Sequence, residues 1–261
     1  MDTEFLDLQT AADRLGVHYQ TAYKWVRSGQ LPAELVCQKY LVDPAEVDAL
    51  SARRQQPSAP TVRRPRGGFG PTVQQFTESL LDGNEGRASG IVERLISDGV
   101  SLTVAIHEVI APSMLGIGLA WEEGKVAVWQ EHRASGIVER ILGENRPNPR
   151  GRRRGTAMVA AVEGELHALP AAMAAAALRE DNWRVHLLGA NLPTTELLDF
   201  CENQTPCLAV ITVSLPTLQE RAETVAIQVR ALGIRSIVGC PGSSLLGLQE
   251  LARSTSNMQS L

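Results

Sequence analysis

Beyond residue 155 the sequence alternates short apolar runs with segments of helical periodicity. The apolar runs are 156–162, 184–188, 208–213 and 235–239, and the helical segments are 170–180, 194–202 and 217–232. This alternation is typical of a parallel β-sheet wrapped by helices. Ligands of such sheets bind beyond the carboxyl ends of the strands. We therefore predict a Rossmann-like domain over 156–261 whose loops form a binding site, and which is short at its C-terminal end because no fifth strand is evident.

Two linkers separate this domain from the rest of the chain. Residues 53–71, with the sequence RRQQPSAPTVRRPRGGFGP, and residues 147–155 are rich in Pro, Gly and Arg and show no apolar periodicity. Between the linkers, over 72–146, four segments have the helical spacing of a four-helix bundle: 73–82, 87–97, 102–121 and 126–142. The octapeptide RASGIVER occurs in two of them, so both helices should bury similar stripes. The prediction is a multidomain α and α/β chain.

The composition excludes several classes of protein. Hydrophobic residues make up 44% and charged residues 21%, which is ordinary for a globular protein. No run approaches the twenty apolar residues of a membrane helix and the start does not read as a signal peptide, so we expect a cytoplasmic protein with no membrane partner. The four cysteines form no C-x-x-C pair, which argues against a zinc site.

Residues 1–52 have the plan of a winged helix-turn-helix domain. In LQTAADRLGVHYQTAYKWVRSGQLP one helix ends near Leu15, Gly16 lies in the turn, and a second helix begins near Tyr19. A short hairpin and a closing helix follow. A three-helix packing module is the alternative. Polar and aromatic residues that could contact DNA lie on the second helix and on the hairpin: Tyr19, Gln20, Tyr23, Lys24, Arg27, Lys39 and Tyr40.

The charge of this domain bears on how it would bind DNA. Residues 1–66 contain nine Lys or Arg and eight Asp or Glu, so the domain is nearly neutral. Weak single copies favour binding as an oligomer on repeated half-sites. We expect a homo-oligomer, a dimer or a tetramer, that assembles through the C-terminal half and binds double-stranded DNA.

Two further motifs point to a bulky ligand. Trp121 is followed after nine residues by Glu131 and His132, which places an aromatic ring, a carboxylate and an imidazole near one another. In the loop after the first apolar run, Glu165 precedes His167, and imidazole is a good cobalt donor when an acid orients its other nitrogen. Taken singly, the tryptophan fits a core position and the histidine a solvated loop.

Together, in this order, these motifs resemble the cobalamin-binding modules in which a four-helix bundle caps a Rossmann-like domain. The N-terminal segment resembles the DNA-binding domain of excisionase-type and MerR-type proteins. The combination is similar to the light-responsive, adenosylcobalamin-dependent transcriptional regulators. The resemblance implies that His167 is the lower axial cobalt ligand, and that Trp121, Glu131 and His132 shelter the 5′-deoxyadenosyl group.

The resemblance also implies a pocket for the nucleotide tail of the cofactor. Leu188-Gly189-Ala190-Asn191-Leu192-Pro193 matches the family's Leu-Gly-x-x-x-Pro loop. The positions that line the tail match Gly189, Pro193, Ser214, Leu215, Gly239 and Gly242. The chain departs from the family at Pro170, where a glycine is usual, and at Glu122, where some light-responsive members have a histidine.

We therefore expect a cobalamin-dependent transcriptional regulator, a repressor that responds to light, and not an enzyme. One alternative is a regulator of the same architecture that senses another ligand or cobalamin abundance. A corrinoid carrier for methyl transfer is a third possibility, against which the attached DNA-binding domain argues.

Overall fold

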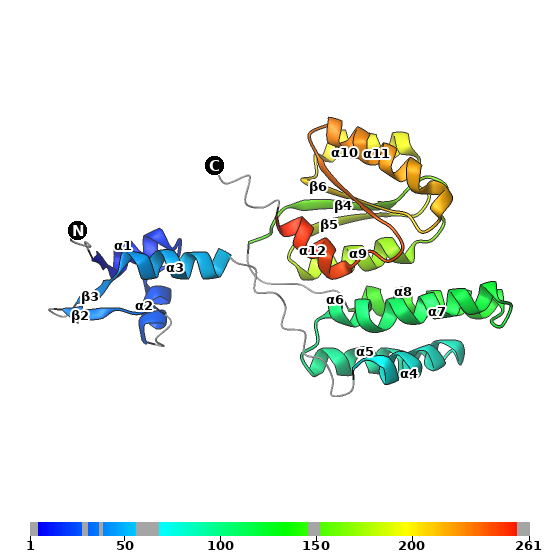
Figure 1. Cartoon of the computed structure of the whole chain (residues 1–261), viewed down its shortest axis with the longest axis horizontal. Coiled ribbons are helices and arrows are strands. Elements are labelled where there is room, and N and C mark those ends of the chain that lie inside the picture. The colour runs from blue at the N-terminus through cyan, green and yellow to red at the C-terminus, as the bar shows by residue number, and fades with distance from the viewer. Residues whose placement is uncertain (1–4, 28–30, 37–38, 56–67, 146–151, 255–261) are drawn as a thin grey trace. The chain divides into compact units, whose positions relative to one another are not determined.

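The computed structural model describes residues 5–27, 31–36, 39–55, 68–145 and 152–254. The chain divides into two compact units, Met1–Thr61 and Val62–Leu261. Each unit is described by itself below, with the helices and strands of Figure 1.

The first unit is a small helical domain with a three-stranded antiparallel sheet. Its elements are β1 (Leu6–Asp7), α1 (Leu8–Arg14), α2 (Tyr19–Arg27), β2 (Glu34–Val36), β3 (Lys39–Val42) and α3 (Pro44–Gln55), with strand order β1-β3-β2. The Asp7 side chain caps α1 by accepting a hydrogen bond from the Thr10 N–H at 2.7 Å. Gly16 has φ +64° in the turn between α1 and α2. The helix-turn-helix plan and the hairpin are confirmed; β1 was not predicted.

The second unit begins with the helical bundle. Its helices are α4 (Gly70–Leu81), α5 (Glu85–Ser97), α6 (Leu102–Ala105), η1 (Ile106–Ile110), α7 (Ala111–Glu122) and α8 (Val128–Glu144). Segments α6, η1 and α7 form one continuous helix, in which η1 is a wide turn of π-helix. The two helices that carry the repeated octapeptide bury similar stripes, as predicted, because each copy and the residue after it contribute matching residues to one core: Ile91, Val92 and Leu95, and Ile137, Val138 and Ile141.

The long helix Leu102–Glu122 corrects one expectation from the sequence. By length and composition it is apolar enough to cross a membrane, with mean hydropathy 1.6 over an 18-residue window. Half of that window is buried within the protein, and residues such as Ile106, Val109 and Ile117 belong to the bundle core. Its apolar character is thus accounted for by packing against the other helices of the bundle.

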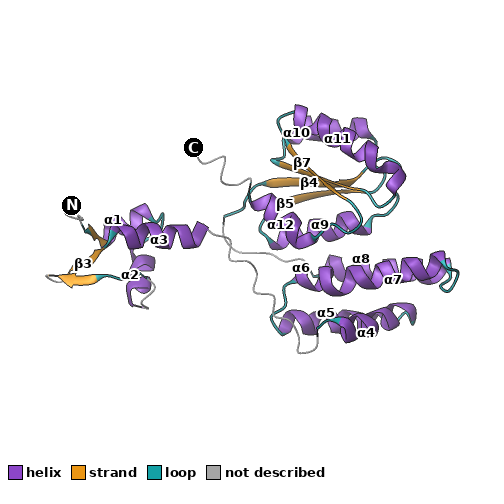
Figure 2. Cartoon of the chain, in the orientation of Figure 1, coloured by secondary structure: helices purple, strands orange, loops and turns teal. Residues whose placement is uncertain are grey.

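The rest of the unit is a parallel sheet between two layers of helices, as Figure 2 shows. Its elements are β4 (Thr156–Ala161), α9 (Leu169–Glu180), β5 (Arg184–Gly189), α10 (Thr194–Gln204), β6 (Leu208–Thr212), η2 (Pro216–Leu218), α11 (Gln219–Ala231), β7 (Arg235–Gly239) and α12 (Leu245–Arg253). Alternate residues of β4 face opposite layers: Val159 packs with α9 and α12, and Met158 with α10 and α11.

The strand order is β5-β4-β6-β7 and all pairs are parallel. After β4 the chain forms β5 on one side of β4, and later it forms β6 on the other side of β4. The loops after β4 and β6 therefore diverge, which is where open α/β sheets bind ligands. The Rossmann-like prediction is confirmed. Within the described residues the fourth strand is followed by α12 and not by a fifth strand.

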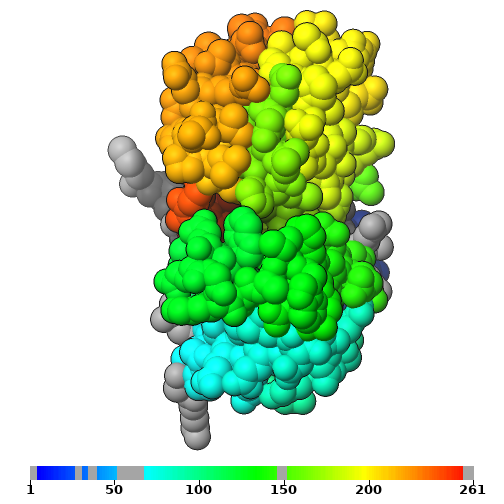
Figure 3. Space-filling model, turned by 90° about the vertical axis from the view of Figure 1, so that its right-hand side faces the viewer, coloured from blue at the N-terminus to red at the C-terminus, as the bar shows by residue number. Residues whose placement is uncertain are grey.

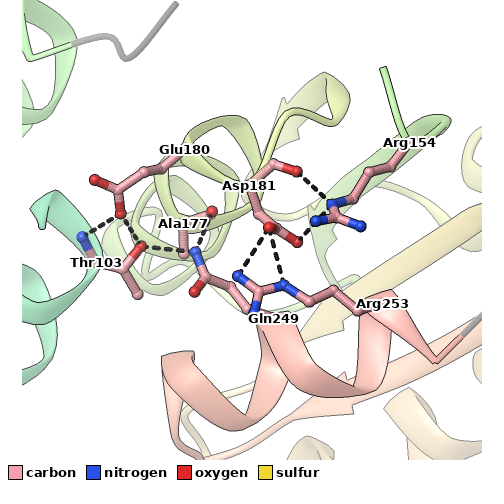
Figure 4. A network of polar contacts seen from close by, with 7 residues as sticks. All are labelled: Thr103, Arg154, Ala177, Glu180, Asp181, Gln249 and Arg253. Atoms are coloured by element: carbon pink, nitrogen blue, oxygen red, sulfur yellow. Dashed lines mark hydrogen bonds and ion pairs between the residues drawn. The ribbon is translucent and has the colours of Figure 1, made fainter. Parts of the chain in front are cut away.

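The bundle packs against the sheet domain through α9, and Figure 3 shows α6 to α8 as the layer next to the sheet domain. Met173 and Ala176 of α9 are buried in the bundle core. A polar joint lies beside them (Figure 4). There the Glu180 carboxylate accepts hydrogen bonds from the N–H groups of Leu102 and Thr103 at 2.7 and 2.8 Å, at the first turn of α6.

The C-terminal helix completes this joint. The Gln249 side chain of α12 donates hydrogen bonds to the Thr103 hydroxyl and to the Ala177 carbonyl, at 2.9 and 2.8 Å. Beside it the buried Asp181 carboxylate pairs with Arg253 at 2.9 Å and with Arg154 at 3.2 Å. The joint therefore links α6, α9 and α12.

Candidate cofactor site and DNA-binding surface

The loop after β4 carries the candidate cobalt ligand. The Nδ1 atom of His167 lies 2.5 Å from Oε1 of Glu165, and the Glu165 side chain is fully buried. Because Nδ1 is occupied, Nε2 is the nitrogen left for a ligand, and the His167 side chain is 57% exposed. This is the pairing of carboxylate and imidazole that orients metal-binding histidines.

Glu165 is in turn held by the loop after β6. Its Oε2 atom accepts hydrogen bonds from the N–H groups of Ser214 and Leu215, at 2.5 and 3.1 Å. The structure thus brings four of the predicted site residues together at the divergence of β4 and β6. Sequence reasoning paired Glu165 with His167; the contact with Ser214 and Leu215 joins segments far apart in the chain.

The charge state of Glu165 follows from these contacts. Burial opposes ionisation, but hydrogen bonds from His167, Ser214 and Leu215 outweigh it and hold the pKa of Glu165 below its usual value of 4.5. The group is therefore an acceptor for all its partners at neutral pH. An ionised Glu165 keeps the proton of His167 on Nδ1, so that Nε2 presents a lone pair.

The other residues predicted for the tail pocket lie at the same end of the sheet. Gly189 ends β5 with φ +86°, and Pro193 directly precedes α10. Gly239 ends β7, and Gly242 follows in the next turn with φ +85°. A Cβ atom at Gly189 or Gly242 would meet no neighbour within 4 Å, so the backbone there is open to close approach.

Pro170 fits the fold without distortion. It is the second residue of α9, where the missing N–H has no partner to lose within the helix. Pro170 therefore replaces the family's glycine without interrupting α9, which begins two residues after His167.

On the bundle, the predicted residues lie on two consecutive helices. Trp121 is in the last turn of α7 and 45% exposed, and Glu131 and His132 are in the first turns of α8. The Glu131 carboxylate accepts a hydrogen bond from the Ser135 hydroxyl at 2.7 Å and lies 3.7 Å from Nε2 of His132. The His132 side chain is 73% exposed. These side chains leave much of their surface free for a ligand.

Arg133 is a neighbour that sequence reasoning missed. Its guanidinium donates a hydrogen bond to the Leu81 carbonyl at the end of α4 and lies 5.0 Å from the centre of the Trp129 ring. It thereby ties the start of α8 to another bundle helix. An arginine after a Glu-His pair gives no signal of this role in the sequence.

The donor set fits a metal that arrives with its own ligands. Among the described residues no group of three or more His, Cys, Asp or Glu could hold a metal ion. A single oriented imidazole suits a metal whose remaining positions are filled by a macrocycle. The residues after β4 therefore fit a corrin-bound cobalt.

In the first unit, α2 presents the side predicted to contact DNA. Tyr19 and Tyr23 are about two-fifths exposed, and Gln20 and Lys24 are exposed. Ala22 of the same helix is buried in the core of the unit. The side chains of Arg27 and Lys39 lie outside the described part of the structure.

Tyr40 of β3 is partly buried against the core, with its ring 5.9 Å from that of Tyr23 and nearly perpendicular to it. This contact links the hairpin to α2. Sequence reasoning assigned both tyrosines to DNA contact and did not foresee that they touch each other.

Comparison with known protein families matches two segments of the chain. Residues 5–55 match the helix-turn-helix domain family, and residues 72–144 match the family described as B12 binding domain. The chain thus combines a helix-turn-helix domain with a segment that matches a B12 binding domain, which confirms the combination of a DNA-binding domain and a cobalamin-binding module predicted from the sequence.

One similar curated protein is a helix-turn-helix repressor by name. The chain is 31% identical to the HTH-type transcriptional repressor CarH of Myxococcus xanthus over 132 residues. This match covers 49% of the chain and 44% of the relative, so the chain spans less than half the length of that protein.

Among solved structures, the monomethylamine corrinoid protein of Methanosarcina barkeri is similar in fold. The TM-score is 0.55 at 13% identity, and the match covers 74% of this chain and 98% of that one. At this identity the likeness shows the fold alone.

Proposed function

We propose that the protein is a cobalamin-dependent transcriptional repressor in which Nε2 of His167 is the lower axial ligand of cobalt. The observation that carries the proposal is the buried Glu165, which engages Nδ1 of His167 and leaves Nε2 for a ligand. The match of residues 72–144 to the B12 binding domain supports the choice of cofactor.

The nucleotide tail of the cofactor would enter the sheet domain beside His167. Ser214 and Leu215 would line its path after β6, since they already contact Glu165. The open glycines, Gly189 and Gly242, would admit the tail close to the backbone, with Pro193 and Gly239 flanking it.

The upper face would be sheltered by the bundle. Adenosylcobalamin supplies a cobalt–carbon bond that light can break. Trp121 would pack on the adenosyl group, and Glu131 and His132 would donate to or accept from its polar edges. Without that group, Trp121, Glu131 and His132 would lose these contacts, and the bundle could shift relative to the sheet domain.

DNA binding would follow from assembly. Residues 1–66, which are nearly neutral, would bind DNA weakly as a single copy, and a dimer or tetramer formed by the C-terminal half would bring several copies to one operator. The side of α2 with Tyr19, Gln20, Tyr23, Lys24 and Arg27 would enter the major groove. Lys39 and Tyr40 would lie near the DNA backbone. We place this protein in the cytoplasm, where its DNA is.

The test is the absorption spectrum of the protein reconstituted with adenosylcobalamin in the dark and then illuminated, with the elution volume recorded in both states. We expect a retained chromophore, a change of spectrum and size on illumination, and an altered spectrum in His167→Ala. The matched control is His186→Phe, which removes an imidazole from the same domain but keeps a ring against Phe200, 5.5 Å away. It should behave as wild type.

A second candidate is a regulator of the same architecture that senses cobalamin abundance or another ligand. Glu122 favours it, because some light-responsive relatives have a histidine at that place. Retained cobalamin without any effect of light on spectrum or size would support abundance sensing. If the protein retains no cobalamin, the remaining hypothesis is a regulator that senses another ligand.

A further inference from the structure

Asn191, in the loop between β5 and α10, contacts the histidine-bearing loop through both its side chain and its backbone. Its Oδ1 atom accepts a hydrogen bond from the Gly164 N–H at 2.8 Å. Its own N–H donates to the Glu165 carbonyl, also at 2.8 Å. Asn191 therefore holds the two residues that stand just before Leu166 and His167.

The backbone conformation explains why this position suits asparagine. Asn191 has φ +52°, in the left-handed region that asparagine tolerates better than most residues. Gly164 has φ +89°, and the turn that it forms directs its N–H to Asn191, while the Glu165 N–H donates to the Val162 carbonyl. A glycine at 191 would keep the conformation but lack the acceptor.

Two loops thus fix Glu165 from opposite ends of the residue. The loop after β6 holds its carboxylate through Ser214 and Leu215, and the loop after β5 holds its backbone through Asn191. Since Glu165 orients the ring of His167, an error in the position of its backbone is passed to Nε2. The Glu165 N–H is held within its own loop by the Val162 carbonyl, and Asn191 adds the contact that ties the Glu165 carbonyl to a neighbouring loop.

We propose that Asn191 is a positioning residue for the axial histidine. By fixing the loop, Asn191 sets the distance of Nε2 of His167 from the sheet, and this distance determines how tightly Nε2 binds cobalt. This rests on the proposed function, in which His167 is the cobalt ligand. Asn191 itself touches neither the metal nor the reacting atoms in this proposal.

The chain contains a matched control in Asn182, which precedes β5 at the opposite end of the same strand. Asn182 also has a positive φ, +66°, and its side-chain amide makes one hydrogen bond, to the Arg152 carbonyl at 2.9 Å. Asn182→Gly and Asn191→Gly should therefore lose comparable stability. Only the second change alters the loop of His167.

The experiment compares Asn191→Gly, Asn191→Asp and Asn182→Gly in the full-length protein, by the absorption spectrum with hydroxocobalamin and by its dissociation rate. We expect Asn191→Gly to shift the spectrum toward cobalamin without a histidine ligand and to release it about three- to tenfold faster, as for one lost hydrogen bond. Asn191→Asp keeps the acceptor and should restore binding to within about threefold, the remainder reflecting repulsion from Glu163 and Glu165. Asn182→Gly should match wild type.

Amide hydrogen exchange of residues 162–168 without cofactor separates this proposal from the proposed function. Faster exchange in Asn191→Gly than in Asn182→Gly is expected whether or not cobalamin binds. If the wild type retains no cobalamin, the proposed function fails, and the role of Asn191 toward cobalt fails with it, even if exchange shows that it orders the loop. If cobalamin binds and Asn191→Gly equals Asn182→Gly in spectrum, release and exchange, the positioning role alone is overturned.

Discussion

The loop after β4 and the bundle surface around Trp121 would face the same cofactor, yet they are held very differently. Glu165 is buried, and hydrogen bonds reach it from the loops after β5 and β6 as well as from His167. Trp121, by contrast, is nearly half exposed and His132 is largely exposed, and the contacts of Glu131 are to its near neighbours Ser135 and His132.

This difference indicates a division of labour between the two surfaces. A loop fixed before the ligand arrives loses little entropy on binding, so the sheet domain is suited to hold the cofactor. A surface whose side chains gain their contacts from the ligand is suited to report a change in it. The predictions below test that division, from the largest expected effect to the smallest.

Glu165→Ala should have the largest effect on the loop after β4, by weakening its binding of the cofactor. The change removes the acceptor that orients His167 and leaves the N–H groups of Ser214 and Leu215 without their partner. We expect cobalamin affinity to fall about 10- to 100-fold, measured by titration of the absorption spectrum. Glu163→Ala, in the same loop, removes two long contacts, with the N–H and the hydroxyl of Thr194 at the start of α10, and should lower the affinity about threefold or less. Equal losses in both variants would contradict the special role of Glu165.

Glu180→Ala tests whether the bundle is anchored at the end away from Trp121. It leaves the first N–H groups of α6 without an acceptor beside the buried Thr103. We expect the free energy of unfolding to fall by about 1.5–3 kcal/mol, as measured by urea denaturation. Glu144→Ala, at the exposed end of α8, should change it by less than about 0.5 kcal/mol. If Glu180→Ala and Glu144→Ala had the same free energy of unfolding, Glu180 would not anchor the bundle.

The pH dependence of stability should carry the signature of Glu165. Its pKa is lowered in the folded protein, so ionised Glu165 stabilises the fold above pH 4.5, and that contribution is lost as the pH falls through the lowered pKa. Without cofactor, the difference in unfolding free energy between wild type and Glu165→Gln should shrink between pH 7 and pH 3. A difference that grows toward acid would contradict the lowered pKa.

Trp121→Ala should have the smallest effect on the apoprotein. Because the ring is 45% exposed, its removal should change the unfolding free energy by less than about 1 kcal/mol. The preference for adenosylcobalamin over hydroxocobalamin should nevertheless fall, as measured from the two dissociation constants. Trp129→Ala is the control, since this ring is 61% exposed and packs beside Arg133. If Trp121→Ala left this preference unchanged, the surface around Trp121 would not be the one that responds to the adenosyl group.

The sequence predicted the sheet well because its central strands are buried on both faces. Strands β4 and β6 begin and end within one residue of the predicted runs. Strand β1 was missed because it has only two residues and is defined by its pairing with β3. Helix α12 was also missed; its buried positions, Leu248, Gln249 and Ala252, form a short stripe that includes a polar residue, and Gln249 is buried because it bonds to Thr103.

The residues of the candidate site also differ in whether the sequence could predict them. Glu165 and His167 were recognisable because their side chains carry the chemistry and are two residues apart. The role of Asn191 depends on a backbone N–H of Gly164, 27 residues earlier, and on the shape of both loops. Such a role has no signature in residue type or spacing. The role becomes evident only from the way the two loops lie against each other in the fold.

The wide turn Ile106–Ile110 sets the register of everything that follows in its helix. A π-helical turn accommodates one more residue than an α-helical turn. Because each residue of an α-helix advances about 100° around the axis, narrowing this turn to α-helical width without removing a residue would rotate α7 by roughly that angle. Trp121 would then point along a different direction, although no residue near it had changed. The identity of the surface presented by α7 is therefore decided more than ten residues away, by the width of a single turn.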